Sequence, residues 1–129
     1  MLGRLLALVR RRDRDTSRER TMVEPQAVRD LTPQEVAAGL AAGRILLVDV
    51  REPNETAAER IAGSVLLPLS RFDPEDIPDR QGRAVVFTCA VGIRSLRAAE
   101  AALDAGHAYD AHLAGGLKAW KAAGFPIER

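Results

Sequence analysis

The chain has 129 residues, enough for one compact domain, and its 47% hydrophobic and 29% charged residues are ordinary for a globular protein. A single cysteine excludes an intramolecular disulfide and any Cys-x-x-Cys redox or zinc motif. The net charge of +1 is unevenly spread, because residues 1–20 hold seven arginines and three acids while the remainder is mildly acidic. Such a remainder offers no general nucleic-acid surface, and we expect no nucleic-acid partner.

Residues 1–25 predict a basic, flexible extension in front of one domain over residues 26–129. The apolar residues of Met1–Val9 fit one helical face, but the run is too short to span a bilayer and lacks a secretory cleavage site. An alternative is an interfacial helix, in which residues 1–20 make a peripheral contact with anionic lipid. Translation from Met22 is a third interpretation. Without a signal peptide, we expect a cytoplasmic protein.

Short apolar runs alternate with helix signals along the domain. Thr32, Pro33 and Glu35 have the spacing of a capped helix start, and Gly43 stops that helix. The predicted elements are a strand over 27–31, a helix from 33 to the stop at 43, a strand over 45–50, a helix over 53–60, a strand over 64–67, at most a turn or two of helix around 74–78, a strand over 84–88, a helix over 96–105, a strand over 109–113 and a helix over 117–123. This alternation predicts an α/β fold with an about five-stranded, mostly parallel sheet and helices on both faces.

The only cysteine, Cys89, lies where a buried strand ends and a helix begins. The main-chain amides of such a turn are unpaired, and the helix N-terminus carries about half a positive charge, so a thiolate and an anionic ligand are both favoured there. Gly92 allows the chain to fold tightly around the sulfur, and Arg94 adds positive charge. The pattern therefore indicates a nucleophile in an anion-binding loop, against the simpler interpretation of an inert core cysteine.

The carboxyl ends of parallel strands lie on one edge of a sheet, so Asp49, Cys89 and the pair Gly115-Gly116 are expected to meet there. The two histidines, His107 and His112, lack partners at metal-ligand spacing and are interpreted as surface or sheet-edge residues. We accordingly expect neither a metal ion nor a cofactor.

Four segments resemble, in the same order, the motifs of single-domain rhodaneses. They are Val48–Pro53, Ile61–Pro68, Cys89–Ser95 and Leu113–Ile127, and the resemblance covers about residues 28–127. It implies a single rhodanese-like domain with sulfurtransferase activity, a small anionic sulfur donor, and a thiol or protein thiol as sulfur acceptor.

The resemblance also implies roles for individual residues. The Cys89 thiolate would take the outer sulfur of a donor such as thiosulfate, hold it as a persulfide and pass it to cyanide or a thiol, without a separate general base. The substrate-binding loop would comprise Ala90, Val91, Gly92, Ile93, Arg94 and Ser95. Within it, Arg94 would pair with an anionic donor or support the loop, and Ser95 would contribute a hydroxyl and cap the next helix. Asp49 and Arg51 would tie neighbouring loops together.

Two departures from the family pattern bear on the substrate. Glu59-Arg60 stands where many members have Gly-His, so any role of that histidine is absent. Ala90 and Val91 are small and uncharged, whereas members that prefer thiosulfate often carry basic residues there, which argues against a strong thiosulfate preference.

Two other function classes share a cysteine-centred loop. Related phosphatases and arsenate reductases place five residues between cysteine and arginine, whereas four separate Cys89 from Arg94, which gives a narrower loop suited to one sulfur atom. A non-catalytic redox sensor or interaction module with a rhodanese fold is the other alternative, because a reactive thiol can also sense oxidants by forming a sulfenic acid.

Overall fold

A computed structural model describes residues 27–129, so the predicted flexible extension over 1–25 and its alternatives lie outside the described residues. The strands are β1 (Arg29–Leu31), β2 (Ile45–Asp49), β3 (Val65–Leu66), β4 (Ala84–Thr88) and β5 (Ala111–Leu113). The helices are α3 (Pro33–Ala41), α4 (Pro53–Ala58), α5 (Ile93–Asp104) and α6 (Gly116–Ala122), with short 3₁₀ turns η2 (Leu69–Arg71) and η3 (Pro74–Asp76) between β3 and β4.

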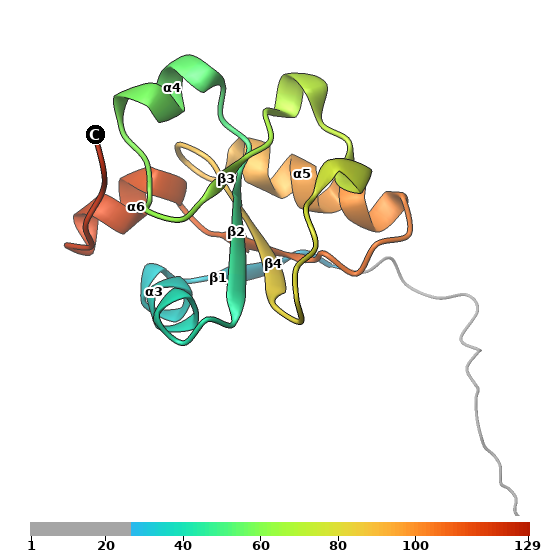
Figure 1. Ribbon diagram of the computed structural model, residues 1–129, viewed down its shortest axis with the longest axis horizontal. Helices are drawn as coiled ribbons and strands as arrows, with labels where there is room; N and C mark the ends of the chain where they lie inside the picture. Colours follow the sequence, from blue (N-terminus) through green and yellow to red (C-terminus); the bar gives the residue numbers. More distant parts are fainter. Residues whose placement is uncertain (1–26) are drawn as a thin grey trace, which may run out of the picture.

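These strands form one sheet in the order β1-β5-β4-β2-β3, and every neighbouring pair in it is parallel (Figure 1). The predicted α/β class is therefore confirmed. In the described part of the chain, no helix is long and apolar enough to cross a membrane.

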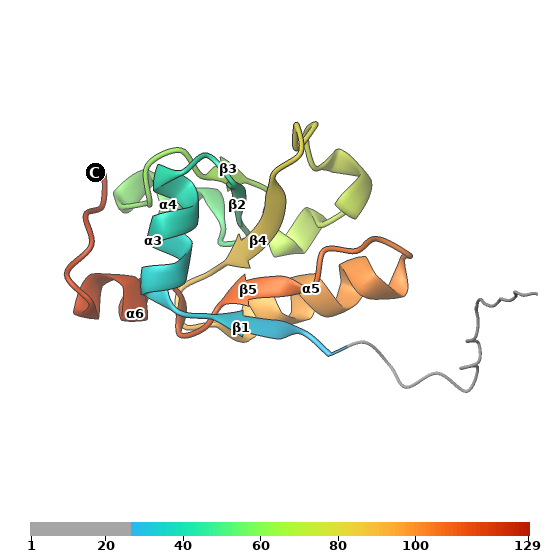
Figure 2. The ribbon, with the colours of Figure 1, turned by 90° about the horizontal axis from the view of Figure 1, so that it is seen from below.

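The core has two halves because successive side chains of a strand point to opposite faces of the sheet. Ile45 and Leu47 of β2 pack in one cluster with residues of α3 and α6, whereas Leu46 and Val48 pack in the other with α5. Figure 2 shows α3 and α6 on one side of the sheet and α5 on the other. All five residues of β2 are buried, as expected for a strand covered on both faces.

Several predicted boundaries hold closely. The strand over 84–88 is reproduced, and α3 begins with the expected capping box, in which the Thr32 hydroxyl accepts from the Glu35 amide at 3.1 Å and the Glu35 carboxylate accepts from the Thr32 amide at 2.8 Å. The strands expected over 64–67 and 109–113 are shorter, because only Val65–Leu66 and Ala111–Leu113 pair with a neighbouring strand.

The start of α5 differs from the prediction. The helix begins at Ile93 rather than at 96, with Gly92 at its N-cap in a left-handed conformation of φ +98°. Arg94 and Ser95 therefore belong to the first helical turn, and the prediction that Ser95 caps the helix is wrong. A glycine N-cap provides no side-chain acceptor, so it is a weaker helix-start signal in a sequence than Ser, Thr, Asp or Asn.

The position of His112 also differs from the prediction. β5 lies between β1 and β4, and His112 aligns with Asp30 on one neighbour and with Phe87 on the other. Its residue is 5% exposed, so the interpretation as a surface or sheet-edge histidine is wrong. Hydrophobic periodicity identifies strands but not their order, and the order is what buries this side chain.

The start of α6 contacts the segment that follows β4. The Leu117 amide donates to the Cys89 carbonyl at 2.8 Å, and the Lys118 amide donates to the Ala90 carbonyl at 3.0 Å. Gly116, at φ +59°, makes this approach feasible, because a Cβ there would overlap the Cys89 carbonyl oxygen and lie 2.7 Å from the Ala90 carbonyl carbon. The absence of a side chain at 116 thus lets α6 hold the cysteine segment in place.

We expect Gly116→Ala to destabilise the protein far more than Gly43→Ala. Gly43 also has a left-handed φ, +70°, but nothing lies within 4 Å of a Cβ there, so its substitution costs only the conformational term of about 1–2 kcal/mol. The crowded site at 116 adds roughly 1–3 kcal/mol for overpacking. Urea unfolding followed by circular dichroism measures both, and equal losses would contradict the close-approach argument.

Candidate active site

The sheet edge formed by the carboxyl ends of β2 and β4 carries most of the residues singled out in the sequence. Asp49 is the last residue of β2, and Cys89 directly follows β4. Ala114 alone separates β5 from Gly115, the N-cap of α6. Asp49 aligns with Thr88 beside Cys89, and the start of α6 donates to the Cys89 carbonyl, so the expected meeting of these three positions occurs. Cys89 is 1% exposed and lies beneath the turn that leads into α5.

Main-chain amides surround the Cys89 sulfur. It accepts hydrogen bonds from the Gly92 amide at 3.0 Å and the Ser95 amide at 3.3 Å, and the Ser95 hydroxyl lies 3.4 Å away. Burial raises the pKa of the Cys89 thiol, but the hydrogen bonds from Ser95, Gly92 and Val91 together outweigh it, so the net pKa is lowered. The site therefore favours the thiolate, which is the reactive form of cysteine.

The loop residues divide into two groups by exposure. The Val91 and Ile93 side chains face solvent, at 51% and 60% exposed, while Ser95 is fully buried. Ala90 contributes its carbonyl to the contact with α6. The close hydrogen bonds to the sulfur come from the Gly92 and Ser95 amides, and the Val91 amide makes a smaller contribution to the lowered pKa of Cys89. The loop therefore presents two apolar side chains to solvent and keeps its polar contacts with the sulfur inside.

Arg94 pairs with a residue that the sequence analysis did not single out. Its guanidinium donates to both carboxylate oxygens of Glu55, at 2.7 and 3.0 Å, and so joins α5 to α4. The bidentate hydrogen bond from Arg94 lowers the pKa of Glu55 from 4.5 to about 2. The Glu52-x-x-Glu55 spacing marks a helix start, and Glu55 indeed accepts from the Glu52 amide at 2.9 Å, but no local signal indicates a partner 39 residues away.

Asp49 and Arg51 form the tie expected from the sequence. The Arg51 guanidinium contacts the Asp49 carboxylate at 2.8 Å, and both side chains are at most 4% exposed. The same guanidinium nitrogen donates to the Glu59 carbonyl at 2.8 Å, so the end of β2 is joined to the residue after α4. Removing either charge would leave the other buried without its partner.

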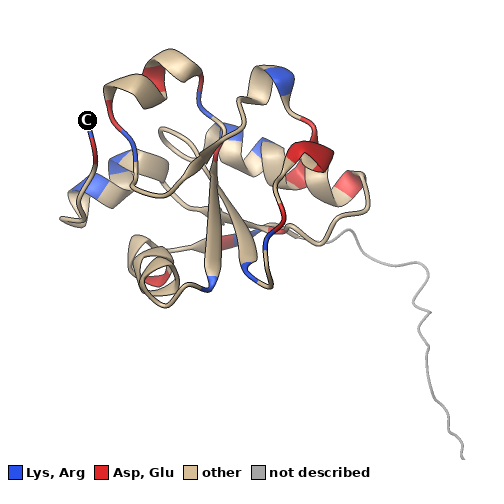
Figure 3. Cartoon of the chain, viewed as in Figure 1, with Lys and Arg blue, Asp and Glu red and all other residues tan. Residues whose placement is uncertain are grey.

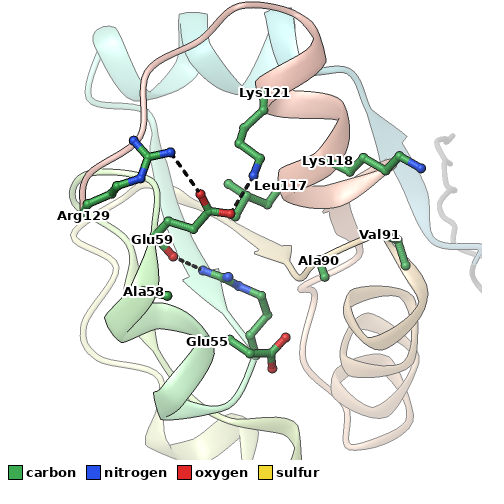
Figure 4. A pocket seen from close by; sticks show the side chains of 10 residues that line it. Glu55, Ala58, Glu59, Ala90, Val91, Leu117, Lys118, Lys121 and Arg129 are labelled. Atoms are coloured by element: carbon green, nitrogen blue, oxygen red, sulfur yellow. Dashed lines mark hydrogen bonds and ion pairs between the residues drawn. The ribbon is translucent and has the colours of Figure 1, made fainter.

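A pocket of about 550 Å³ lies between α4, the cysteine loop and α6 (Figure 4). Ala90 and Val91 form part of its wall, and Lys118, Lys121 and Arg129 supply positive charge. Lys121 contacts the Glu59 carboxylate at 2.6 Å across the pocket. Figure 3 shows the basic residues on α6 and at the C-terminal end opposite acidic residues of the α4 region. The pocket offers mixed charge beside the loop, and Cys89 contributes no wall to it.

A second pocket of about 450 Å³ lies on the other side of the loop, where Val91, Gly92 and Ile93 meet Asp30 and His112. Among residues 27–129, no group of three or more His, Cys, Asp or Glu side chains is placed to hold a metal ion.

A family model of the rhodanese-like domain matches residues 32–123. The chain belongs to this family. The match includes β2, the cysteine loop and α6, which together build the site described above.

Two curated relatives place this rhodanese-like chain among larger proteins. It is 44% identical over 82 residues to the uncharacterized protein slr1261 of Synechocystis, covering 64% of this chain and 46% of that one. It is 38% identical over 95 residues to the probable adenylyltransferase/sulfurtransferase MoeZ of Mycobacterium tuberculosis, covering 70% of this chain and 24% of that protein. The chain therefore spans less than half the length of either relative.

Solved structures share the fold. A Rhodopseudomonas palustris protein described as a possible tyrosine phosphatase has a TM-score of 0.68 and 34% identity, with 78% of this chain and 85% of that chain covered. A thiosulfate sulfurtransferase from Pseudomonas aeruginosa has a TM-score of 0.69 and 27% identity, with 79% of this chain and 20% of that chain covered. The rhodanese-like domain thus has sulfurtransferase homologues at modest identity.

The Glu55–Arg94 pair predicts an acid-dependent loss of stability. Because the folded-state pKa of Glu55 is depressed, the pair stabilises the protein above pH 4.5 and loses its contribution as the pH falls toward about 2. Glu55→Gln keeps the oxygen that accepts from the Glu52 amide but removes the charge. We expect it to cost up to ~1 kcal/mol at neutral pH, as for partly exposed ion pairs, and nothing at the acid end of this range.

Urea unfolding of wild type and Glu55→Gln at successive pH values measures this difference. Glu100→Gln, at an exposed position on α5, is the matched control and should show no such pH-dependent difference. A difference in the free energy of unfolding between wild type and Glu55→Gln that stays constant with pH would contradict a stabilising Glu55–Arg94 pair.

Proposed function

We propose that this rhodanese-like protein is a sulfurtransferase that carries one sulfane sulfur as a persulfide on Cys89. The observation that supports the proposal is the cysteine sulfur at the end of β4, which accepts hydrogen bonds from two main-chain amides, lies 3.4 Å from the Ser95 hydroxyl and has a lowered pKa. Sulfurtransferase relatives such as MoeZ support the same reaction class.

In the first half of the proposed reaction, the Cys89 thiolate attacks the outer sulfur of thiosulfate. A new bond forms between the two sulfurs, the sulfur–sulfur bond of thiosulfate breaks, and sulfite leaves with the electron pair. In the second half, a thiolate or cyanide attacks the outer sulfur of the persulfide, and the Cys89 thiolate leaves. The fixed amides of Gly92 and Ser95 provide donors for the anion in both halves.

The charge around the loop bears on which donor is used. Both terminal nitrogens of the Arg94 guanidinium donate to the Glu55 carboxylate, and the neighbouring Ala90 and Val91 carry no charge. A doubly charged donor such as thiosulfate therefore meets little unpaired positive charge at the loop itself. We infer that a persulfide donor of lower charge serves this site as well as thiosulfate does.

Mass spectrometry of the intact protein tests the persulfide. Incubation with thiosulfate, or with a low-molecular-weight persulfide, should add one sulfur atom to wild type and none to Cys89→Ser, because the chain has one cysteine. Cyanide should remove the added sulfur and yield thiocyanate.

The other outcomes identify the alternatives. No adduct from either donor, together with rapid peroxide oxidation of Cys89, would contradict sulfur transfer and favour a redox sensor. Hydrolysis of p-nitrophenyl phosphate that depends on Cys89 would favour a phosphatase. An adduct from the persulfide alone would keep the sulfurtransferase and exclude thiosulfate as its donor.

Charge variants at the loop test the donor inference. Glu55→Gln frees Arg94 and should raise kcat/KM for thiosulfate by up to about fivefold, and Arg94→Gln should lower it by a similar factor, the size of a partly exposed charge interaction. A persulfide donor, whose reacting group carries one negative charge rather than two, should respond less to both substitutions. Equal losses with both donors in both variants would mean that the pair acts on the loop structure alone.

A further inference from the structure

A continuous line of polar contacts leads from the Cys89 sulfur to the sheet edge opposite the 550 Å³ pocket. The Ser95 hydroxyl lies 3.4 Å from the sulfur and 2.8 Å from Nδ1 of His112. Nε2 of the same ring lies 2.8 Å from the Asp30 carboxylate. Ser95 and His112 are 0% and 5% exposed, so the middle of this line is buried. The sulfur transfer proposed above uses neither Asp30 nor His112.

The donor and acceptor chemistry sets the direction of each hydrogen bond. The Asp30 side chain is 72% exposed, and an ionised carboxylate only accepts, so Nε2 of His112 carries a proton. In the neutral ring Nδ1 then has no proton and accepts from the Ser95 hydroxyl. The Ser95 oxygen is left as an acceptor toward the thiol, and the Cys89 S–H is its donor. All three hydrogen bonds therefore point from the thiol toward Asp30.

We propose that His112 is the proton acceptor for Cys89, acting through the Ser95 hydroxyl and held in position by Asp30. The Cys89 thiol proton passes to the Ser95 oxygen while the Ser95 hydroxyl proton passes to Nδ1 of His112. One S–H bond is replaced by one N–H bond, and the serine is unchanged. The product is a thiolate that accepts from the Ser95 hydroxyl and an imidazolium ring that donates to Asp30. The family resemblance implied no separate base, whereas these contacts place one beyond the Ser95 hydroxyl.

Four groups from three neighbouring elements determine the electrostatics of His112 in the described part of the chain. Asp30 on β1 contacts Nε2 of the ring, and Cys89 after β4 is linked to Nδ1 through the Ser95 hydroxyl. Arg97 and Glu100 on α5 line the same 450 Å³ pocket as His112, and their opposite charges offset each other. These are the charged groups that face the ring from β1, from the segment after β4 and from α5.

A purely structural histidine would join α5, β5 and β1 without affecting the thiol. The test must therefore measure whether the titration of Cys89 and that of His112 depend on each other. The inference rests on the proposed function for the use made of the thiolate, but the proton transfer itself needs no sulfur donor and can be measured without one. Two titrations measure it: the ultraviolet absorbance of the Cys89 thiolate against pH, and the ring-nitrogen NMR signals of His112. The chain has one cysteine and two histidines, so both signals are readily assigned.

We expect His112→Asn and Ser95→Ala to move the thiolate transition to higher pH and to slow alkylation by iodoacetamide at neutral pH by about tenfold. Asp30→Asn, at an exposed carboxylate, should change the thiolate transition and the alkylation rate in the same direction but by less. His107→Asn is the matched control, because His107 contacts Glu75 and stacks on Tyr109 away from the loop. It should leave the thiolate transition unchanged.

Coupling must also be reciprocal. In Cys89→Ser, which removes the thiolate, the His112 ring should lose its proton at a lower pH than in wild type, while His107 should titrate as before. This arm keeps the proposal falsifiable where His112→Asn does not fold. A His112 midpoint that is the same in wild type and Cys89→Ser would overturn the proposal, as would an unchanged alkylation rate in a folded His112→Asn.

The outcomes separate this inference from the proposed function. A persulfide on Cys89 without coupling between the two titrations would keep sulfur transfer and reject His112 as the proton acceptor. Coupling without a persulfide from any donor would keep the proton transfer and reject the sulfurtransferase.

Discussion

Burial of one sulfur atom at the end of β4 is the constraint on which the site depends. Cys89 is 1% exposed, so burial alone would keep its thiol protonated, and the surrounding hydrogen bonds must oppose that cost. They do so only because Gly92 adopts φ +98° and directs its amide at the sulfur, and because Gly116 lets α6 hold the carbonyls of the cysteine segment. The two glycines therefore act on opposite sides of the same short segment.

Charged pairs connect this segment to the rest of the edge. The Asp49–Arg51 pair fixes the end of β2 and, through the Glu59 carbonyl, the residue after α4. Glu55 on α4 then holds Arg94 on α5. α4 is thereby bound at both ends, although it has only six residues and one buried side chain. Short helices are not stable alone, so its position depends on these pairs.

Local signals in the sequence predicted much of the fold but few of the side-chain contacts of the site. The capping box at Thr32 and the apolar strand before Cys89 are read from consecutive residues, and both agree with the structure. The Arg94–Glu55 pair and the contact of His112 with Asp30 join residues 39 and 82 positions apart. Such contacts follow from strand order and crossover geometry, which periodicity does not encode.

The burial of Cys89 also explains why uncharged hydrogen-bond donors suit a site that carries sulfur. In the proposed transfer the protein alternates between a thiolate and a persulfide, and both carry one negative charge near the same place. Main-chain amides and a hydroxyl stabilise either anion without moving, whereas a free arginine would favour the charged donor and its departing product as well. The positive charge of Arg94 is instead paired within the protein, because its guanidinium donates to the Glu55 carboxylate at 2.7 Å. The stabilisation that remains at the sulfur is therefore selective for the anion bound to Cys89.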